Sequence, residues 1–262
     1  MTLYIEQTKI QRAIKSKTVK VEAFDVIDST NEYLKRIDNS HYKNHICIAE
    51  YQSKGKARLQ RGWYSSYAKN VLLSMTHSFK KNHSELGGLS VIVSLSILKT
   101  LLTLKLSSKF KIKWPNDVYF KDQKISGILI ETMEKSSKEC NAVIGIGLNV
   151  NMVESMKGIF TNWTSLKRIT SKDFDRNKIC ILLIKNLIEV LNEFEITGLK
   201  PFLTRWKKHD YLLGKSITIK NDGNIMQGLY KGINEAGNLL LQTKEGKVIP
   251  VASGDASIGE IV

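Results

Sequence analysis

The pattern of apolar and turn-forming residues changes abruptly near residue 211, and this change constrains the fold more than any other feature of the chain. After it, short runs of β-forming residues alternate with turns rich in Asn, Asp and Gly, such as residues 221–224 and 234–237. Short strands separated by such turns predict a small all-β barrel. We therefore expect two domains, residues 1–211 and residues 212–262.

The first 211 residues mix strand and helix patterns. Strands are predicted at residues 19–24, 45–50, 71–75 and 142–149, a hairpin at 118–130, and helices at 89–104, 177–194 and 200–206. Ser29 is followed three residues later by Glu32, which is the pattern of a capping box and predicts that another helix begins there. This mixture is typical of an α+β domain, and the chain is long enough to bury a core.

Charge and cysteine content limit the possible partners. The net charge of +15, from 40 Lys+Arg against 25 Asp+Glu, favours anionic partners, although a lysine-rich source genome gives the same excess. The apolar tract 89–104 is shorter than a membrane span, and the start of the chain has no signal-peptide pattern. Cys47, Cys140 and Cys180 are far apart and form no CxxC pair. We expect a cytoplasmic protein with no membrane partner.

Residues 55–63, Gly-Lys-Ala-Arg-Leu-Gln-Arg-Gly-Trp, place three cations and two glycines in one loop. Glycine lets the backbone approach a ligand closely, and Lys and Arg supply charge-assisted donors, so this loop can wrap phosphate groups. It lacks the Gly-Lys-Ser/Thr ending of a P-loop. A solvated basic surface loop is the alternative interpretation.

Residues 113–117, Lys-Trp-Pro-Asn-Asp, form a second unusual segment. Pro115 fixes the backbone where a strand passes into a turn, and the next two side chains are an amide and a carboxylate. Such hard oxygen ligands suit a metal ion beside a nucleotide. A β-turn with a packed indole is the alternative.

The order and spacing of these two segments resemble those of the biotin protein ligases, and the resemblance extends from about residue 28 into the C-terminal barrel. It implies a catalytic domain related to class II aminoacyl-tRNA synthetases and lipoate ligases, followed by an SH3-like barrel. It also implies an enzyme that uses ATP and Mg²⁺ to convert biotin to biotinyl-AMP. The biotin then passes to a lysine of a biotin carboxyl carrier protein, as in acetyl-CoA carboxylase.

The resemblance assigns roles to individual residues. For biotin it implies Ser29, Thr30, Asn31, Gln52, Lys56, Ala57, Arg58 and Lys124; for ATP, Arg58, Arg61, Trp63, Asn116, Asn149 and Trp163; for the metal, Asp117; and for catalysis, Lys124, Arg58 and Asp117. Without the resemblance, residues 28–31 are better explained as a helix cap alone, and Trp163 is explained equally well as a core residue. The family loop usually reads Gly-Arg-Gly-Arg with a further glycine, so Lys56, Ala57 and Gln60 depart from it. Residues 254–259 lack the arginine that family members often carry near ATP.

Two rival functions remain open. A lipoate–protein ligase shares the fold and the chemistry, and a basic nucleic-acid-binding protein is favoured by the charge alone. Bifunctional family members carry an N-terminal winged helix that binds operator DNA. Only about twenty residues precede the first predicted strand here, so we expect the monofunctional type, without sequence-specific DNA binding. A homodimer is left open.

Overall fold

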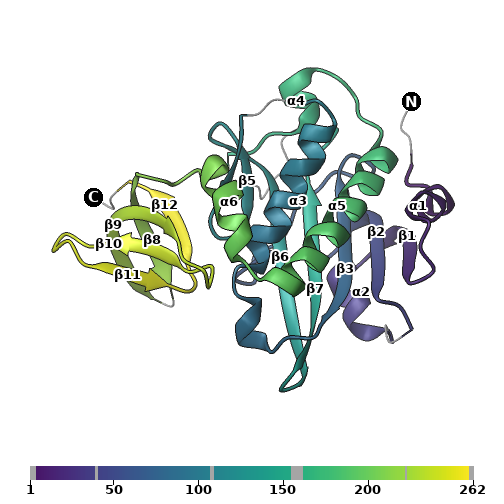
Figure 1. Ribbon diagram of the computed structural model, residues 1–262. Coiled ribbons are helices and arrows are strands. Elements are labelled where there is room, and N and C mark those ends of the chain that lie inside the picture. Colours follow the sequence, from purple (N-terminus) through teal and green to yellow (C-terminus); the bar gives the residue numbers. More distant parts are fainter. Residues whose placement is uncertain (1–3, 39–40, 107–108, 155–161, 222, 260–262) are drawn as a thin grey trace.

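The computed structural model describes residues 4–38, 41–106, 109–154, 162–221 and 223–259 (Figure 1). They form a seven-stranded sheet with helices packed on it, followed by a five-stranded antiparallel sheet. The expected α+β architecture with a C-terminal β domain is therefore confirmed.

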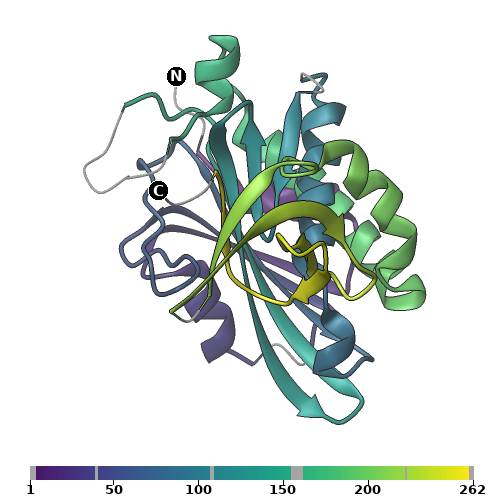
Figure 2. The ribbon, with the colours of Figure 1, turned by 90° about the vertical axis from the view of Figure 1, so that its left-hand side faces the viewer.

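The large sheet has the strand order β1-β2-β3-β7-β6-β5-β4, with β1 and β2 parallel and the other neighbours antiparallel. The strands are β1 (Val19–Ile27), β2 (Asn44–Gln52), β3 (Val71–Phe79), β4 (Phe110–Lys113), β5 (Asp117–Phe120), β6 (Gln123–Ser136) and β7 (Glu139–Leu148). Strand β4 is the strand expected to pass into the turn at Pro115, although its starting residue was not predicted. Strands β6 and β7 extend beyond the predicted strand ends at residues 130 and 142, and the hairpin that joins them forms the lowest point of the molecule in Figures 1 and 2.

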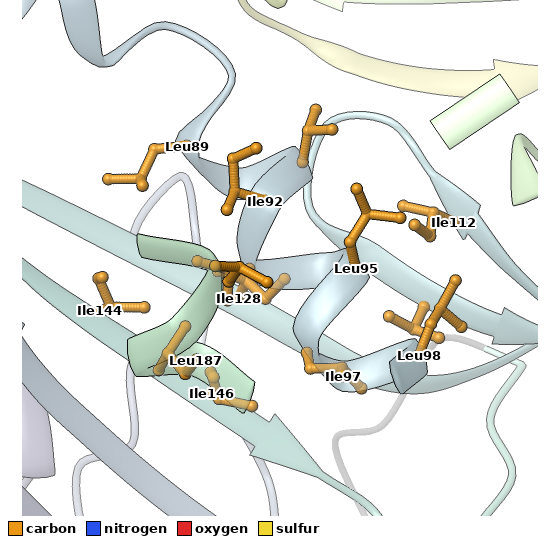
Figure 3. Packing of buried hydrophobic residues seen from close by; sticks show 14 of the residues in the cluster. Leu89, Ile92, Leu95, Ile97, Leu98, Ile112, Ile128, Ile144, Ile146 and Leu187 are labelled. Carbon is orange, nitrogen blue, oxygen red and sulfur yellow. The ribbon is translucent and has the colours of Figure 1, made fainter. Parts of the chain in front are cut away.

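Helices α3 (Leu89–Thr103) and α5 (Arg176–Thr197) cover one face of this sheet. The helical stretch His83–Thr103 has the length and hydropathy of a membrane span, but most of it is buried. Figure 3 shows how α3 is buried: its apolar side chains pack against those of the sheet and of α5. The labelled residues are Leu89, Ile92, Leu95, Ile97, Leu98, Ile112, Ile128, Ile144, Ile146 and Leu187. This burial is that of a core helix.

The shorter helices are α1 (Gln7–Ile14), α2 (Thr30–Arg36), η1 (His83–Leu86), α4 (Leu166–Thr170), η2 (Lys200–Phe202) and α6 (Leu203–His209). Of these, α1, η1 and α4 were not predicted. The predicted cap of α2 is half right. Ser29 Oγ accepts from the Glu32 amide, but the Ser29 amide donates to Asp28 Oδ1 at 2.7 Å instead of to Glu32. The Glu32 carboxylate pairs with Lys35 and Lys56.

Helix α1 covers the edge strand β1 with two amide side chains. Gln11 Nε2 donates to the Val19 carbonyl at 2.9 Å, and Gln11 Oε1 accepts from the Val21 amide at 2.7 Å. Gln7 Oε1 accepts from the Ala23 amide at 3.1 Å. Three backbone groups of an edge strand are thus satisfied by side chains instead of by a neighbouring strand.

The C-terminal sheet has the order β11-β10-β9-β8-β12. Its strands are β8 (Ser216–Asn221), β9 (Asn224–Ile233), β10 (Leu239–Gln242), β11 (Val248–Val251) and β12 (Asp255–Ile258), of which only β12 was not predicted. The arrangement agrees with the predicted SH3-like fold. Among the described strands, β11 and β12 are the two ends of this order.

Trp114 joins the two sheets. Its indole Nε1 donates to the Gly237 carbonyl at 3.0 Å, in the turn between β9 and β10. The segment before α3 also approaches this turn closely. A Cβ on Gly87 would lie 2.4 Å from the Ala236 carbonyl oxygen, so the contact between the two backbones needs a glycine at position 87. The packed indole that the sequence left as an alternative is therefore real, and it holds the C-terminal sheet beside the residues described next.

Candidate active site

One cavity of about 430 Å³ brings together every site residue that the sequence singled out. These are Ser29, Thr30, Asn31, Gln52, Lys56, Ala57, Arg58, Arg61, Trp63, Asn116, Asp117, Lys124, Asn149 and Trp163. The cavity wall also contains residues that sequence reasoning did not assign to the site, among them Tyr64, Leu72, Ser74, Met152 and Asp255. The described elements that line it are α2, β2, β3, the loop 55–63, the β5–β6 hairpin, β7 with the segment that follows it, and β12.

Alternation along β7 decides which face of the sheet carries the cavity. Ile144 and Ile146 pack in the core with α3, so Gly145 and Gly147, which alternate with them, face the opposite side of the sheet. There a Cβ on Gly145 would lie 2.3 Å from Asn31 Oδ1, and one on Gly147 would lie 2.3 Å from the Trp63 indole. The missing side chains let α2 and the loop 55–63 rest directly on the sheet.

One end of the cavity is a network of neutral polar groups. The Thr30 amide and Oγ1 both donate to Gln52 Oε1, at 2.7 and 2.9 Å. Ser74 Oγ lies 2.6 Å from both Thr30 Oγ1 and Asn31 Oδ1, and Asn31 Nδ2 donates to Glu131 at 2.8 Å. Fixed donors and acceptors of this kind suit a small neutral ring that carries N–H and C=O groups.

The other end is charged. Lys124 Nζ lies 2.7 Å from Asp117 Oδ1 and 5.7 Å from the centroid of the Trp63 ring. Arg58 Nη1 donates to Asn116 Oδ1 at 3.2 Å. The Asp117 contact is an ion pair without aligned hydrogen-bond geometry, since Asp117 Oδ1 has no hydrogen-bond partner among the described residues. This end therefore offers two cations and a carboxylate oxygen that can accept a further ligand.

The loop 55–63 is tied to the C-terminal sheet. Arg58 donates to the Gly254 carbonyl at 3.3 and 3.4 Å and lies 3.5 Å from Asp255. Arg61 Nη2 donates to Asp255 Oδ2 at 2.7 Å. The second sheet thus reaches the cavity with an acid, at the strand where the family resemblance led us to look for an arginine.

Main-chain bonds place Trp163 in the cavity wall. The Lys124 amide donates to the Asn162 carbonyl at 2.8 Å, and the Thr164 amide donates to the Lys124 carbonyl at 2.9 Å. Asn149 Nδ2 donates to the Thr164 carbonyl at 3.1 Å. Trp163 is only 7% exposed, so it belongs to the packed interior as well as to the cavity. The backbone of Lys124 thereby connects the charged end to the tryptophan.

The sequence matches two family models. Residues 23–149 match the Biotin/lipoate A/B protein ligase family, and residues 212–259 match the Biotin protein ligase C terminal domain. The Bifunctional ligase/repressor BirA of Escherichia coli strain K12 is 33% identical over 239 residues, which cover 91% of this chain and 74% of that protein. The chain belongs to the biotin protein ligase family.

Two further comparisons agree. The biotin–[acetyl-CoA-carboxylase] ligase of Mycobacterium tuberculosis is 26% identical over 215 residues, 80% of this ligase and 77% of that one. Among solved structures, the biotin protein ligase from Aquifex aeolicus in complex with biotin and ATP superposes with a TM-score of 0.78. It is 29% identical, and the match covers 92% of this chain and 99% of the other. The resemblance inferred from the sequence is confirmed.

The departures from the family loop have structural counterparts in this ligase. Gln60, which takes the place of a glycine, has φ +56°, a left-handed conformation that costs a non-glycine residue roughly 1–2 kcal/mol. Lys56 Nζ pairs with Glu32 at 2.7 Å, so its charge is already partly neutralised. Ala57 closes the loop through its amide, which donates to the Arg61 carbonyl at 2.8 Å.

Two residues of the wall had no recognisable signal in the sequence. Ser74 lies in the middle of a buried strand, and only the pairing of β3 with β7 shows that it faces the cavity. Asp255 lies in the C-terminal sheet, 194 residues along the chain from its partner Arg61. A surface acid in a short strand looks like any other solvated residue until the two sheets are placed together.

Proposed function

We infer that the protein is an ATP-dependent biotin protein ligase that adenylates biotin to biotinyl-AMP and transfers the biotin to a specific lysine of a biotin carboxyl carrier protein. The observation that carries this conclusion is a single cavity with a neutral polar end at Thr30 and Gln52 and a cationic end at Lys124 and Arg58. Biotin has the matching polarity, with a neutral ureido ring at one end and a carboxylate at the other. A lipoate ligase is not favoured, because the relatives and complexes described above are those of biotin.

The chemistry follows from the weak reactivity of a carboxylate. A carboxylate oxygen of biotin attacks the α-phosphorus of ATP, and pyrophosphate leaves. The lysine amine of the carrier then attacks the carbonyl carbon, loses a proton, and AMP leaves. We propose that Lys124 acts in the first step, because it offers an ammonium where two anionic groups must approach each other.

We propose that the remaining residues bind the substrates as the sequence indicated. The neutral network supports Ser29, Thr30, Asn31 and Gln52 as the biotin ring site, with Lys56, Ala57, Arg58 and Lys124 along the biotin side of the loop. For ATP we propose Arg58, Arg61, Trp63, Asn116, Asn149 and Trp163. Asn149 contacts the Thr164 carbonyl, so its contribution is to hold the wall that carries Trp163.

We also propose that Mg²⁺ accompanies the nucleotide and that Asp117 holds it. The donor set fits this ion, since Mg²⁺ commonly takes one or two carboxylates together with substrate phosphates and water. Asp117 Oδ1 has no hydrogen bond among the described residues. Those residues include no cluster of three His, Cys, Asp or Glu side chains that would hold a metal without the nucleotide. When bound, the ion would neutralise phosphate charge.

Several finer points stay proposals. We propose the carrier of acetyl-CoA carboxylase as the protein partner, the cytoplasm as the location, and a domain boundary after residue 211. The net charge of +15 supports an acidic partner, and the three free, buried cysteines suit a reducing compartment. We also propose that the protein does not bind DNA in a sequence-specific manner. The oligomeric state is left open.

The test is ATP–pyrophosphate exchange with biotin or lipoate as the acid, followed by transfer to an apo carrier domain. We expect exchange that depends on biotin and a carrier that becomes biotinylated on one lysine. Exchange that depends on lipoate and is indifferent to biotin would contradict the proposed function.

A further inference from the structure

Arg168 stacks on Trp163, the residue proposed above to contact the nucleotide. The Arg168 Cζ lies 3.8 Å from the centroid of the Trp163 ring, which is the distance of a guanidinium lying on an aromatic face. Trp163 belongs to the cavity wall, whereas Arg168 does not. The arginine therefore packs on the indole without itself lining the cavity.

The same guanidinium is fixed by two main-chain carbonyls. Its Nε and Nη2 both donate to the Val153 carbonyl, at 3.1 and 2.8 Å. Its Nη1 donates to the carbonyl of Trp163 itself at 3.4 Å. These bonds use several donors of one planar group, so they set its orientation as well as its position. A lysine has no such fork and cannot reproduce them.

Arg168 is itself held in place by the start of α4. Ser165 Oγ accepts from the Arg168 amide at 3.1 Å and donates to the Met152 carbonyl at 2.5 Å. Met152 also lines the cavity. Trp163 is thus held at two points: its main chain is bridged to the backbone of Lys124, and its ring is covered by the guanidinium of Arg168.

We infer that Arg168 is a positioning residue for the nucleotide base. It does not line the cavity; it holds the Trp163 indole in one orientation, so that a purine stacks on a surface that is already ordered. The inference rests on the proposed function and on Trp163 as the platform for the base. Without Arg168 the indole must be ordered when ATP binds, which weakens ATP binding and leaves the chemistry at phosphorus unchanged.

The experiment is a double-mutant cycle between Arg168 and Trp163, read in biotin-dependent ATP–pyrophosphate exchange. Arg168→Met keeps an unbranched apolar side chain but loses the stack and the hydrogen bonds. It should raise KM for ATP roughly three- to thirtyfold. The kcat and the KM values for biotin and pyrophosphate should change by less than about twofold, because neither ligand contains the base. Arg168→Lys should recover little.

Lys167→Met is the matched control on the same helix. Its ammonium pairs with the exposed Asp173 at 2.8 Å, so this change should alter none of the constants. In a Trp163→Ala background, Arg168→Met should have no further effect on KM for ATP. An equal effect in both backgrounds, or a parental KM in Arg168→Met, would overturn the inference.

Two outcomes separate this inference from the proposed function. If the parent protein shows no exchange, the proposed function fails, and calorimetric binding of ATP to the parent and to Arg168→Met still decides the inference. If Arg168→Met does not fold, Arg168→Gln is carried through the same cycle with the same expectations. Equal affinity of parent and folded variant for ATP would sink the positioning role.

Discussion

Lys124 Nζ and Asp117 Oδ1 lie 2.7 Å apart across the β5–β6 hairpin, so the cation and the acid proposed for the reaction form an ion pair with each other. Both side chains are about one-fifth exposed, at 19% and 18%. A substrate carboxylate or phosphoryl oxygen that approaches Lys124 must therefore compete with Asp117. Once a substrate oxygen replaces Asp117 as the partner of Lys124, the Asp117 carboxylate would be available to a divalent cation.

The first prediction is that Lys124→Ala slows the formation of biotinyl-AMP about tenfold to a few hundredfold, because a charge-assisted hydrogen bond worth roughly 1.5–3 kcal/mol is lost as the new bond forms. Lys121→Ala is the control, since Lys121 is exposed in the turn of the same hairpin. Pre-steady-state adenylation measures both. Equal rates in the two variants would show that Lys124 has no special role.

The second prediction concerns retention of the adenylate. Arg58 connects the loop to Asn116 and to the Gly254 carbonyl, and Arg58→Gly removes both contacts together with the charge. Biotinyl-AMP should escape about ten times faster and label the lysines of bystander proteins. The measurement is the dissociation rate of preformed adenylate. The matched change Lys54→Ala affects an exposed cation outside the cavity wall and should retain the adenylate as the parent does.

The third prediction is that Asp255 restrains the loop before any ligand binds. Asp255→Asn weakens the ion pairs with Arg61 and Arg58, which are partly exposed and worth little individually. Trypsin should then cut within residues 56–61 roughly two- to fivefold faster in the ligand-free protein. Glu245→Gln changes an exposed acid in the turn between β10 and β11 and is the control. An unchanged cleavage rate in Asp255→Asn would refute the restraint.

The fourth prediction is a pH dependence of stability from His77. Burial lowers the pKa of His77 from its ordinary 6.5 to about 4, so the folded state keeps the ring neutral where the unfolded state binds a proton. Stability is therefore present above pH 6.5 and is lost as the pH falls towards 4. The loss amounts to roughly 3 kcal/mol relative to His77→Gln.

Urea unfolding of the parent and of His77→Gln at several pH values between 7 and 4 measures this difference. His41→Gln serves as the control, because the His41 side chain is 80% exposed and should leave the parental pH profile in place. Parallel profiles for the parent and His77→Gln would show that the ring does not titrate as described.

The fifth prediction separates charge from sequence recognition. With a net charge of +15, the protein should bind duplex DNA electrostatically and without sequence preference. For four to six phosphate contacts, affinity should fall roughly a hundredfold or more between 50 and 200 mM salt. Filter binding or anisotropy over this range tests it. Tight, biotin-dependent binding to one palindromic site at physiological salt would contradict the expectation.

Periodicity and spacing carried much of the fold and of the site. The long helices and most strands were predictable because their apolar residues follow a fixed period over many positions. The helix α1 was missed because it has only eight residues, so its apolar positions Ile10 and Ile14 span little more than one turn. Strand β4, at four residues, was too short for its alternation to set its bounds, and only the turn at Pro115 indicated where it ends.

Contacts between distant parts of the chain could not be read from the sequence. The family resemblance placed Lys124 and Trp163 at one site, but the parallel bridge between their backbones depends on how residues 162–164 pack. The stack of Arg168 on Trp163 likewise has no spacing rule, since it joins a helix to the loop before it. Local patterns predict elements, and only their packing decides which polar groups meet.

The two glutamines of α1 have a consequence for the way this protein meets other chains. An uncovered outer strand is a template on which any extended segment can add itself, whether in a partner or in an aggregate. At Val19, Val21 and Ala23 the backbone groups that such a segment would pair with already form hydrogen bonds to side-chain amides of the same molecule. An incoming strand must first break these hydrogen bonds of Gln7 and Gln11, which belong to the same chain. Addition of a strand along this stretch of β1 is therefore disfavoured at any protein concentration.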